Sequence, residues 1–281
     1  MKTHKILTFA LLAAGLTLVS CKDDDELDDN IITVSQVQIE SYENADETAK
    51  DSEFSRLCKD GFKTYELDNQ NQIAQTLDWT YSADVWKSSV KPECVAGNTA
   101  YAVTPALKPE AGRIKFQTGI NNMVSEKISI NRKGNATPVD IKFLHKMCIV
   151  GYTVKLTDGT QASSELIAKI KVSLSQYAEM DYDIIQNKPV AYIGMTTIPM
   201  HSPVYVIPNA DAPYTFTTSY IDNFGRTQST DKQLEAGTFK ANKIYTVELT
   251  VDTVNDNPIQ ITDIHVENWN DVAVDGEMIR K

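Results

Sequence analysis

Apolar and polar residues alternate along much of this 281-residue chain, and this period of two restricts its fold more than any other feature. The clearest example is the segment 245–252, where apolar side chains at odd-numbered positions alternate with polar ones; segments 166–174 and 214–220 behave similarly. Such a period places successive side chains on opposite faces of a β-strand. Helical patterns are scarce, although residues 69–79 could hold a short helix and residues 163–165 would suit a helix start. The sequence therefore predicts an all-β chain of two β-sandwich domains.

Two segments change the phase of this alternation midway. In the first, Ile32 and Val34 point one way, whereas Val37 and Ile39 belong to the other face. In the second, apolar residues at 139, 141 and 143 are followed by apolar residues at 148, 150, 152 and 154. A period-two pattern changes parity when one residue is inserted. Each segment therefore predicts a β-bulge or a strand that passes from one sheet to another.

The loop from Asn131 to Pro138, rich in polar residues and ending in proline, marks the expected boundary between the two domains. It predicts an N-terminal domain over residues 31–135 and a C-terminal domain over residues 136–281. About 260 residues follow the N-terminal signal described next, which suits two domains of ordinary size.

The N-terminus has the features of a lipoprotein signal. Residues 6–19 form an uncharged apolar run that is too short to span a bilayer, and it ends in Leu18-Val19-Ser20-Cys21. This is a lipobox pattern, which predicts cleavage between Ser20 and Cys21, acylation of the Cys21 thiol, and attachment to outer-membrane lipid. The alternative is an ordinary signal peptide with a chance cysteine. Residues 1–20 are thus the expected signal peptide.

Residues 21–30 are strongly acidic and form an expected tether between the lipid and the folded chain. An acidic stretch directly after the lipidated cysteine also resembles the surface-export signal of Bacteroidetes lipoproteins. Either interpretation places the protein outside the cytoplasm, at the outer membrane or cell surface.

Composition limits the classes of function and of site. The formal net charge is −11, and nucleic-acid binding would require clustered Lys and Arg, so no nucleic-acid partner is expected. Besides Cys21 there are Cys58, Cys94 and Cys148, an odd number. Cys58 and Cys94 could form a disulfide, whereas Cys148 lies in an apolar run and is expected to be a buried thiol.

No pattern in the sequence indicates catalysis or a metal. We therefore expect no enzyme activity, no catalytic residue, no metal site and no cofactor. His145 is interpreted as a structural histidine that donates to a backbone carbonyl. Glu179, Asp181 and Asp183 alternate without the glycine of a calcium loop, so they are interpreted as a solvated loop or strand face. The tyrosines at 177, 182, 192 and 205 could form a sugar-stacking platform, but half-buried sheet residues are the preferred interpretation.

Several local patterns, taken in order, resemble the fimbrillins of the Bacteroidetes. The first is an apolar strand, then Phe143-Leu144-His145, then a second apolar strand. The others are a Trp-containing strand, an Ala-Tyr strand ending in proline, an apolar strand before Pro-Asn, a leucine–glycine–tyrosine segment and a late tryptophan. They lie at residues 78–86, 100–105, 204–209, 234–247 and 264–269.

The resemblance implies two transthyretin-like or immunoglobulin-like β-sandwich domains and a structural subunit of a type V pilus. In this family the subunits travel as lipoproteins, a trypsin-like protease removes the N-terminal strand, and the empty groove accepts a strand from a neighbouring pilin subunit. A shaft, tip or anchor role would each fit. The alternative function is a surface lipoprotein that binds a glycan or a host protein.

The resemblance also suggests which residues take part in assembly. The candidate exchanged strand contains Ile32, Val34, Val37 and Ile39, although an ordinary edge strand with a bulge would show the same pattern. Residues 40–53 are polar and are expected to form a mobile loop. Among the nearby basic residues, Arg56 is the candidate protease cleavage site, ahead of Lys50 and Lys59.

Overall fold

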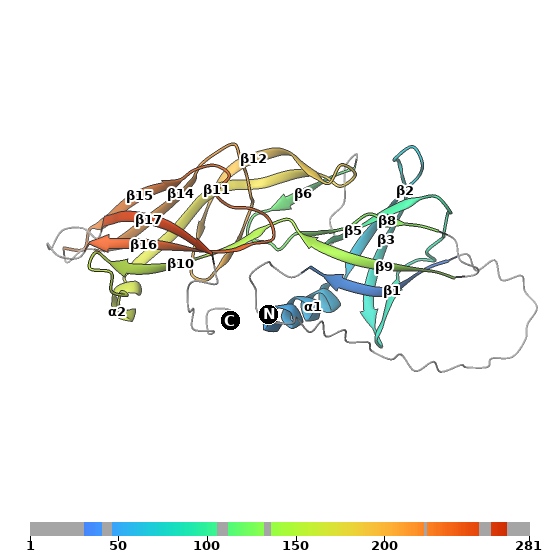
Figure 1. The fold of residues 1–281 in the computed structure, drawn as a ribbon, viewed down its shortest axis with the longest axis horizontal. Helices are drawn as coiled ribbons and strands as arrows, with labels where there is room; N and C mark the ends of the chain where they lie inside the picture. The colour runs from blue at the N-terminus through green and yellow to red at the C-terminus, as the bar shows by residue number, and fades with distance from the viewer. Residues whose placement is uncertain are drawn as a thin grey trace, which may run out of the picture.

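The computed structural model describes residues 31–40, 47–105, 112–131, 136–221, 224–252 and 260–268, and within them strands predominate (Figure 1). The helices in these ranges are α1 (Glu47–Asp60) and the single-turn α2 (Ser164–Ile167). The Ser163 hydroxyl accepts a hydrogen bond from the backbone N–H of Leu166 at 3.3 Å and so caps α2, as the sequence suggested. The all-β fold class is confirmed.

The first sheet contains eight strands from the N-terminal half of the chain. They are β1 (Ile31–Ile39), β2 (Phe62–Leu67), β3 (Ile73–Ser82), β4 (Val85–Ser88), β5 (Thr99–Thr104), β7 (Met123–Ser125), β8 (Ile128–Ser129) and β9 (Ala136–His145). Their order is β1-β9-β7-β5-β2-β3-β4, with β8 paired to β5. The short helix expected within residues 69–79 is therefore wrong, because residues from Ile73 onward form β3. Propensity alone is a weak guide where a neighbouring strand supplies pairing.

The first sheet curls around an apolar core, so that its edge strands β1 and β4 approach each other. At the centre of this core, the Phe62 ring lies 4.7 Å from Trp86, 5.5 Å from Phe143 and 6.1 Å from Trp79, measured between ring centroids. We call the apolar interior that these four residues share with other side chains of the first sheet the first core. Aromatic side chains bury large apolar areas, so these four residues contribute much of its stability.

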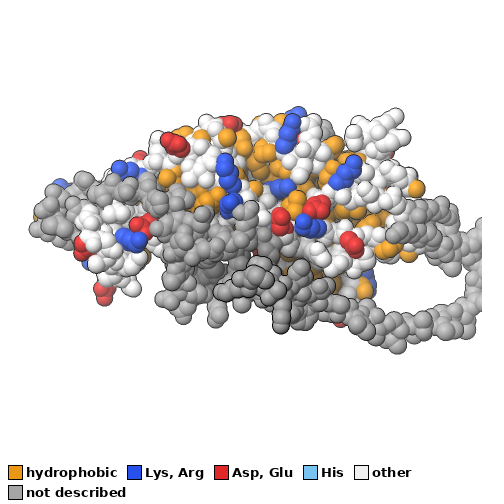
Figure 2. Space-filling view, in the orientation of Figure 1, with side chains coloured by type: hydrophobic (Ala, Val, Ile, Leu, Met, Phe, Trp, Pro, Cys, Tyr) orange, Lys and Arg blue, Asp and Glu red, His pale blue; other side chains and the backbone are white. Residues whose placement is uncertain are grey.

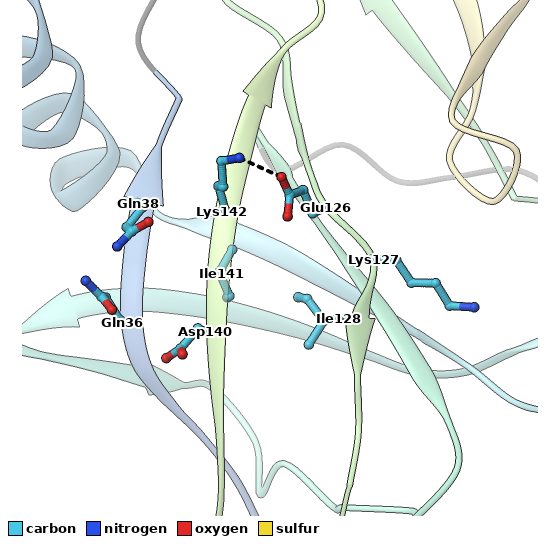
Figure 3. A pocket seen from close by; sticks show the side chains of 8 residues that line it. All are labelled: Gln36, Gln38, Glu126, Lys127, Ile128, Asp140, Ile141 and Lys142. Carbon is cyan, nitrogen blue, oxygen red and sulfur yellow. Dashed lines mark hydrogen bonds and ion pairs between the residues drawn. The ribbon is translucent and has the colours of Figure 1, made fainter.

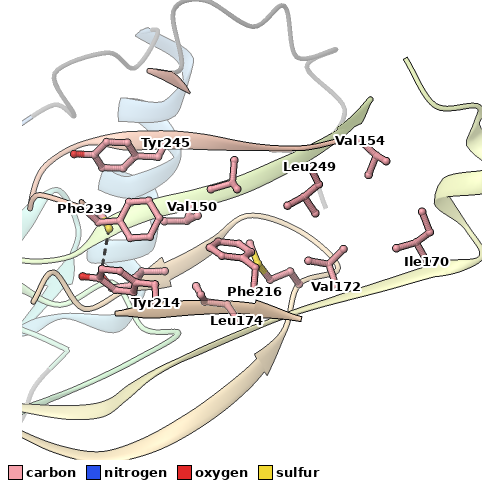
Figure 4. Close-up of a cluster of buried hydrophobic side chains, with 14 of the residues drawn as sticks. Val150, Val154, Ile170, Val172, Leu174, Tyr214, Phe216, Phe239, Tyr245 and Leu249 are labelled. Carbon is pink, nitrogen blue, oxygen red and sulfur yellow. Dashed lines mark hydrogen bonds between the residues drawn. The ribbon is translucent and has the colours of Figure 1, made fainter. Parts of the chain in front are cut away.

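The C-terminal half forms a sandwich of two sheets. The second sheet has the order β13-β10-β16-β17, and the third has the order β12-β11-β14-β15 with β6 also paired to β11. Their bounds are β6 (Arg113–Gln117), β10 (Cys148–Leu156), β11 (Ile170–Asp183), β12 (Lys188–Pro199), β13 (Val204–Val206), β14 (Tyr214–Ile221), β15 (Thr227–Leu234), β16 (Ile244–Asp252) and β17 (Gln260–Asn268). Between the sheets lies a second core, in which Val150, Leu174, Phe216 and Leu249 are fully buried (Figure 4).

A third apolar cluster joins the two halves, and we call it the junction core. Along β5, Ala100 and Ala102 belong to the first core, whereas Tyr101 and Val103 belong to the junction core. The third sheet contributes Phe116, Met180 and Tyr182, among others, from the opposite side. The central strands of the first sheet are therefore buried on both faces.

Both phase changes in the sequence have a structural cause. The pairing of β1 with β9 shifts register between Val34 and Gln36, which is the predicted β-bulge. The segment around His145 changes sheets, since β9 belongs to the first sheet and β10 to the second. Both predictions are confirmed.

Strand pairing crosses the expected domain boundary in both directions. Strand β6 precedes residue 135 but pairs with β11, and β9 follows residue 135 but pairs with β1 and β7. The chain leaves the first sheet between His145 and Cys148. The division into residues 31–135 and 136–281 stays a prediction.

Candidate functional site

Among the described strands, β1 lies at an edge of the first sheet, with β9 as its neighbouring strand and a single bridge from Ile31 to Glu93 besides. It runs parallel to β9, from the pair Ile31–Ala136 to the pair Ile39–Phe143. Its ends are fixed by backbone hydrogen bonds: the N–H of Ile32 donates to the carbonyl of Pro92 and the N–H of Glu40 to that of Phe143, both at 2.8 Å.

The bulge in β1 determines which side chains reach the interior. At the bulge, the Ser35 hydroxyl lies 2.6 Å from a carboxylate oxygen of Asp140 and 3.1 Å from the carbonyl of Val139. The extra residue reverses the parity of the strand. Ile32 before the bulge and Val37 and Ile39 after it therefore all pack against the first core, as does Val34. The structure thus brings the four residues of the candidate exchanged strand together on one core.

The outer surface of β1 and β9 is polar (Figure 3). An open groove of about 200 Å³ is lined there mainly by Gln36, Gln38, Asp140 and the Lys142–Glu126 pair. The Lys142 ammonium lies 2.6 Å from the Glu126 carboxylate, and this hydrogen bond raises the pKa of Lys142. Strand β1 therefore has one apolar and one solvated face, which is the pattern of a strand that can be exchanged without burying polar groups.

The residues after β1 include a helix where the sequence predicted a mobile loop. Helix α1 begins at Glu47, so the expectation of a loop over residues 40–53 is wrong for residues 47–53. Only Leu57 is fully buried among the described side chains of α1, at 2% exposure. A single buried position gives no periodic apolar stripe, so sequence periodicity could not identify this helix.

The candidate cleavage residue Arg56 lies on α1 and is half-buried. Its guanidinium carbon is 5.9 Å from the centroid of the Tyr205 ring in β13, which is a cation–π contact. Burial raises the pKa of Tyr205, and the positive charge of Arg56 opposes this shift. The residue therefore contacts the C-terminal half of the molecule, although it lies in the N-terminal half of the sequence.

One turn before Arg56, Glu53 takes part in a buried polar cluster with His145 and Asn121. The amide nitrogen of Asn121 donates to one Glu53 carboxylate oxygen at 2.9 Å, and His145 Nε2 lies 3.2 Å from the other. His145 Nδ1 is 3.2 Å from the amide oxygen of Asn121. The structural role expected for His145 fits this geometry, and both of these partners are side chains, where the sequence suggested a backbone carbonyl. No local pattern could reveal this set, because Glu53 and Asn121 are 68 residues apart.

The cysteines do not form the disulfide that the sequence allowed. Cys58, Cys94 and Cys148 are all present as thiols, so the Cys58–Cys94 pairing that the sequence left open is not formed. Cys148 is fully buried as predicted, and burial raises its pKa. Ser20 and Cys21, the predicted processing and lipidation residues, lie outside the described residues.

The acidic and tyrosine patterns turn out to belong to the third sheet and the junction core. Asp181 and its alternating neighbours lie in β11, and the described part of the chain contains no cluster of His, Cys, Asp or Glu suited to a metal ion. Tyr177 and Tyr192 stack at 5.1 Å, Tyr182 is buried, and Tyr192 and Tyr205 pack against the junction core. The preferred interpretation as half-buried sheet residues is confirmed for Tyr177, Tyr192 and Tyr205, whereas Tyr182 is almost completely buried.

The visible surface is mixed in charge. On the face shown in Figure 2, the described Lys and Arg side chains are interspersed with Asp and Glu, and no broad field of one sign forms. Within the described ranges, no helix combines the length and apolar character needed to cross a membrane.

No protein-family model and no curated protein matches this sequence. Solved structures do match its fold. A Bacteroides uniformis protein described as a "putative cell adhesion protein" aligns with a TM-score of 0.53 and 17% identity, over 75% of this chain and 91% of its own. A Bacteroides ovatus protein with the same description aligns with a TM-score of 0.53 and 13% identity, over 87% and 99%. The chain therefore has the β-sandwich fold of these two Bacteroides proteins, which is the fold class that its resemblance to fimbrillins implies.

Proposed function

We propose that this chain is a non-enzymatic, fimbrillin-like subunit of a type V pilus, exported as a cell-surface lipoprotein and assembled by strand exchange with other pilin subunits. The observation that carries this proposal is the construction of β1. Among the described strands it is an edge strand whose partner is β9, and four of its five apolar side chains, at positions 32, 34, 37 and 39, pack against the first core. The resemblance to fimbrillins and the fold shared with two Bacteroides proteins support it.

The physical reason for exchange lies in what β1 covers. Without β1, the edge of β9 has unpaired N–H and C=O groups, and the first core loses its cover over Ile141 and Phe143. Exposed apolar area costs about 25 cal/mol per Å². A strand from a neighbouring subunit would pair with these backbone groups and would also cover the apolar core, as β-strand addition does elsewhere. Because donor and acceptor are different surfaces, such contacts repeat head to tail and form fibres.

Export and anchoring rest on Cys21. We expect Cys21→Ser to abolish acylation and to move the protein from the membrane fraction to the soluble periplasmic fraction. Labelling with palmitate and fractionation of cells measure both effects. Retained label and unchanged membrane association in the variant would refute the lipoprotein assignment.

Assembly is tested by cutting the chain after Arg56. The experiment uses the soluble chain that begins at Lys22, digested briefly with trypsin and analysed by size-exclusion chromatography and N-terminal sequencing. We expect the cut chain to form oligomers and lose the fragment that carries β1. The matched control is Arg56→Ala, which should remain uncut at this bond and monomeric.

The donor segment can be located in the same assay. We expect the donor strand to come from the C-terminal segment, from residue 259 onward. Because β17 in this segment pairs with β16 within the chain, it would have to leave the second sheet to act as a donor. A chain that ends at Asn268 retains β17 and removes only residues 269–281. If this truncation is cut but does not oligomerise, the donor lies in the last 13 residues, 269–281.

A cut chain that stays monomeric with β1 still bound would contradict a shaft role. N-terminal sequencing of the protein from cells then separates the remaining roles. A mature chain that retains its lipidated Cys21 favours the anchor, or the alternative of a surface module that binds a glycan or a host protein.

A further inference from the structure

The peptide bond after Arg56 lies within a helix that contacts both halves of the molecule. Ahead of Arg56, the Glu53 carboxylate contacts Asn121 and His145 of the N-terminal half; the His145 side chain is fully buried and that of Glu53 is 13% exposed. Beyond it, Leu57 is buried in the first core. Arg56 itself contacts Tyr205 of β13. Both sides of the bond are therefore held against the protein.

A protease of the trypsin class binds its substrate as an extended strand, so a bond inside a docked helix is cut only after that helix opens locally. Under such conditions the rate of cleavage follows the population of the open form. Each contact that is present only in the docked helix lowers this population. Removing one partner of a buried, hydrogen-bonded carboxylate is among the substitutions that destabilise a docked element most.

We propose that α1 is an autoinhibitory latch: the contacts of Glu53 with His145 and Asn121, together with the contact of Arg56 with Tyr205, keep the bond after Arg56 closed to proteolysis. This inference rests on the proposed function, in which Arg56 is the processing site. The latch couples processing to a folded subunit, because its partners come from β9, from the segment before β7, and from β13.

The order of residues along the chain gives the latch a second effect. Glu53 precedes the scissile bond, so after cleavage it remains on the same fragment as β1. Its contacts with His145 and Asn121 then hold that fragment in place, in addition to the pairing of β1 with β9. The cut and the release of β1 are therefore separate steps, and Glu53 slows both.

The test compares rates of trypsin cleavage after Arg56 in the soluble chain from Lys22, with products identified by intact mass. The variants are Glu53→Ala and Tyr205→Leu, which leave Arg56 unchanged but remove its two sets of restraints. The matched control is Ser55→Ala, an exposed position on the same helix. We expect each of the first two variants to be cut about tenfold faster or more, and the control to be cut at the wild-type rate.

Two further bonds show whether a variant is merely unfolded. Arg113 in β6 and Lys171 in β11 are exposed basic residues within strands, and cleavage after them requires loss of the sheet. Faster cleavage after Arg56 alone supports the latch. Wild-type rates in both variants overturn it, and so does a parallel increase at all three bonds.

The cleavage rates test the latch whether or not the cut chain forms oligomers. Variants that are cut faster but stay monomeric would support the latch and contradict the pilus proposal. Cut chains that oligomerise, together with variants cut at the wild-type rate, would contradict the latch and leave the pilus proposal standing.

Discussion

At the scale of single residues, the thiols of Cys58, Cys94 and Cys148 differ in how far solvent can reach them. Cys58 on α1 is partly exposed, whereas Cys94 and Cys148 are 3% and 0% exposed. Burial raises the pKa of Cys148, so its reactive thiolate is scarce even where a reagent enters. We expect one thiol of the soluble chain from Lys22 to react with a thiol reagent under native conditions and three in denaturant. A Cys58→Ser variant with no fast-reacting thiol identifies it, and a remaining fast thiol would contradict this assignment.

Glu66 provides a test of pH dependence. It is 3% exposed, and burial raises its pKa although its carboxylate accepts hydrogen bonds from Asn98 and Gln75 at 2.8 and 2.9 Å. The folded chain therefore binds this proton more tightly than the unfolded chain, whose Glu pKa is about 4.3. Glu66 thus contributes stability that is fully present below the unfolded pKa and is lost as the pH rises through the folded pKa.

The measurement compares the wild-type chain with Glu66→Gln, which cannot titrate. As the pH falls from 7 to 4, we expect the free energy of unfolding of the wild-type chain to rise relative to that of the variant. Urea denaturation at several pH values measures it. A difference that is constant with pH, or that changes in the opposite direction, would rule out this titration.

The sequence predicts the burial of residues whose environment is set by their near neighbours in the chain. The burial of Cys148 follows from the apolar run around it. The partners of His145 could not be predicted, because Glu53 and Asn121 come from distant parts of the sequence and carry no joint pattern.

At the scale of elements, the bulge in β1 can be removed by deleting Ser35. Deletion restores the uninterrupted period of two, so the residues on one side of the bulge turn toward solvent. We expect the free energy of unfolding to fall by about 2–4 kcal/mol, from the loss of two partly buried apolar side chains. Ser35→Ala keeps the bulge and loses only the hydroxyl contacts, so it should cost about 1 kcal/mol. Equal effects of the two changes in urea denaturation would show that the bulge does not set the faces of β1.

The contrast between β1 and α1 shows which elements a sequence reveals. The bulge leaves a parity change that can be read along nine residues of strand. Helix α1 has no such trace, because its position depends on isolated contacts of Glu53, Arg56 and Leu57 with elements distant in sequence.

At the scale of the whole molecule, the junction core should make the two halves unfold together. Phe116 is fully buried there and stacks on Tyr182 with 5.1 Å between ring centroids. We expect Phe116→Ala to lower the free energy of unfolding by about 3–5 kcal/mol while preserving a single transition. Differential scanning calorimetry tests this by comparing calorimetric and van't Hoff enthalpies. Two separate transitions, of which only one shifts in the variant, would show that the halves are independent.

The junction core shows why the all-β fold class could be predicted from the sequence, whereas the pairing between distant strands could not. Alternation along each strand indicates that one face is buried, and this sufficed for the fold class. The pairing of β6 with β11 joins residues about 65 positions apart, such as Phe116 with Met180, and nothing local to either strand specifies the other.

The parallel pairing of β1 with β9 has a mechanical consequence. Tension applied through a tether at Cys21 would pull on the N-terminal end of β1, while the body resists through the C-terminal end of β9, which continues into β10. In this geometry the force runs along the strands and loads all the hydrogen bonds of the pair together, in shear, instead of opening them one at a time. In the lipid-anchored subunit proposed above, this pair would resist fluid drag, and after the proposed cut at Arg56 and before β1 is released it would carry much of the load between membrane and body.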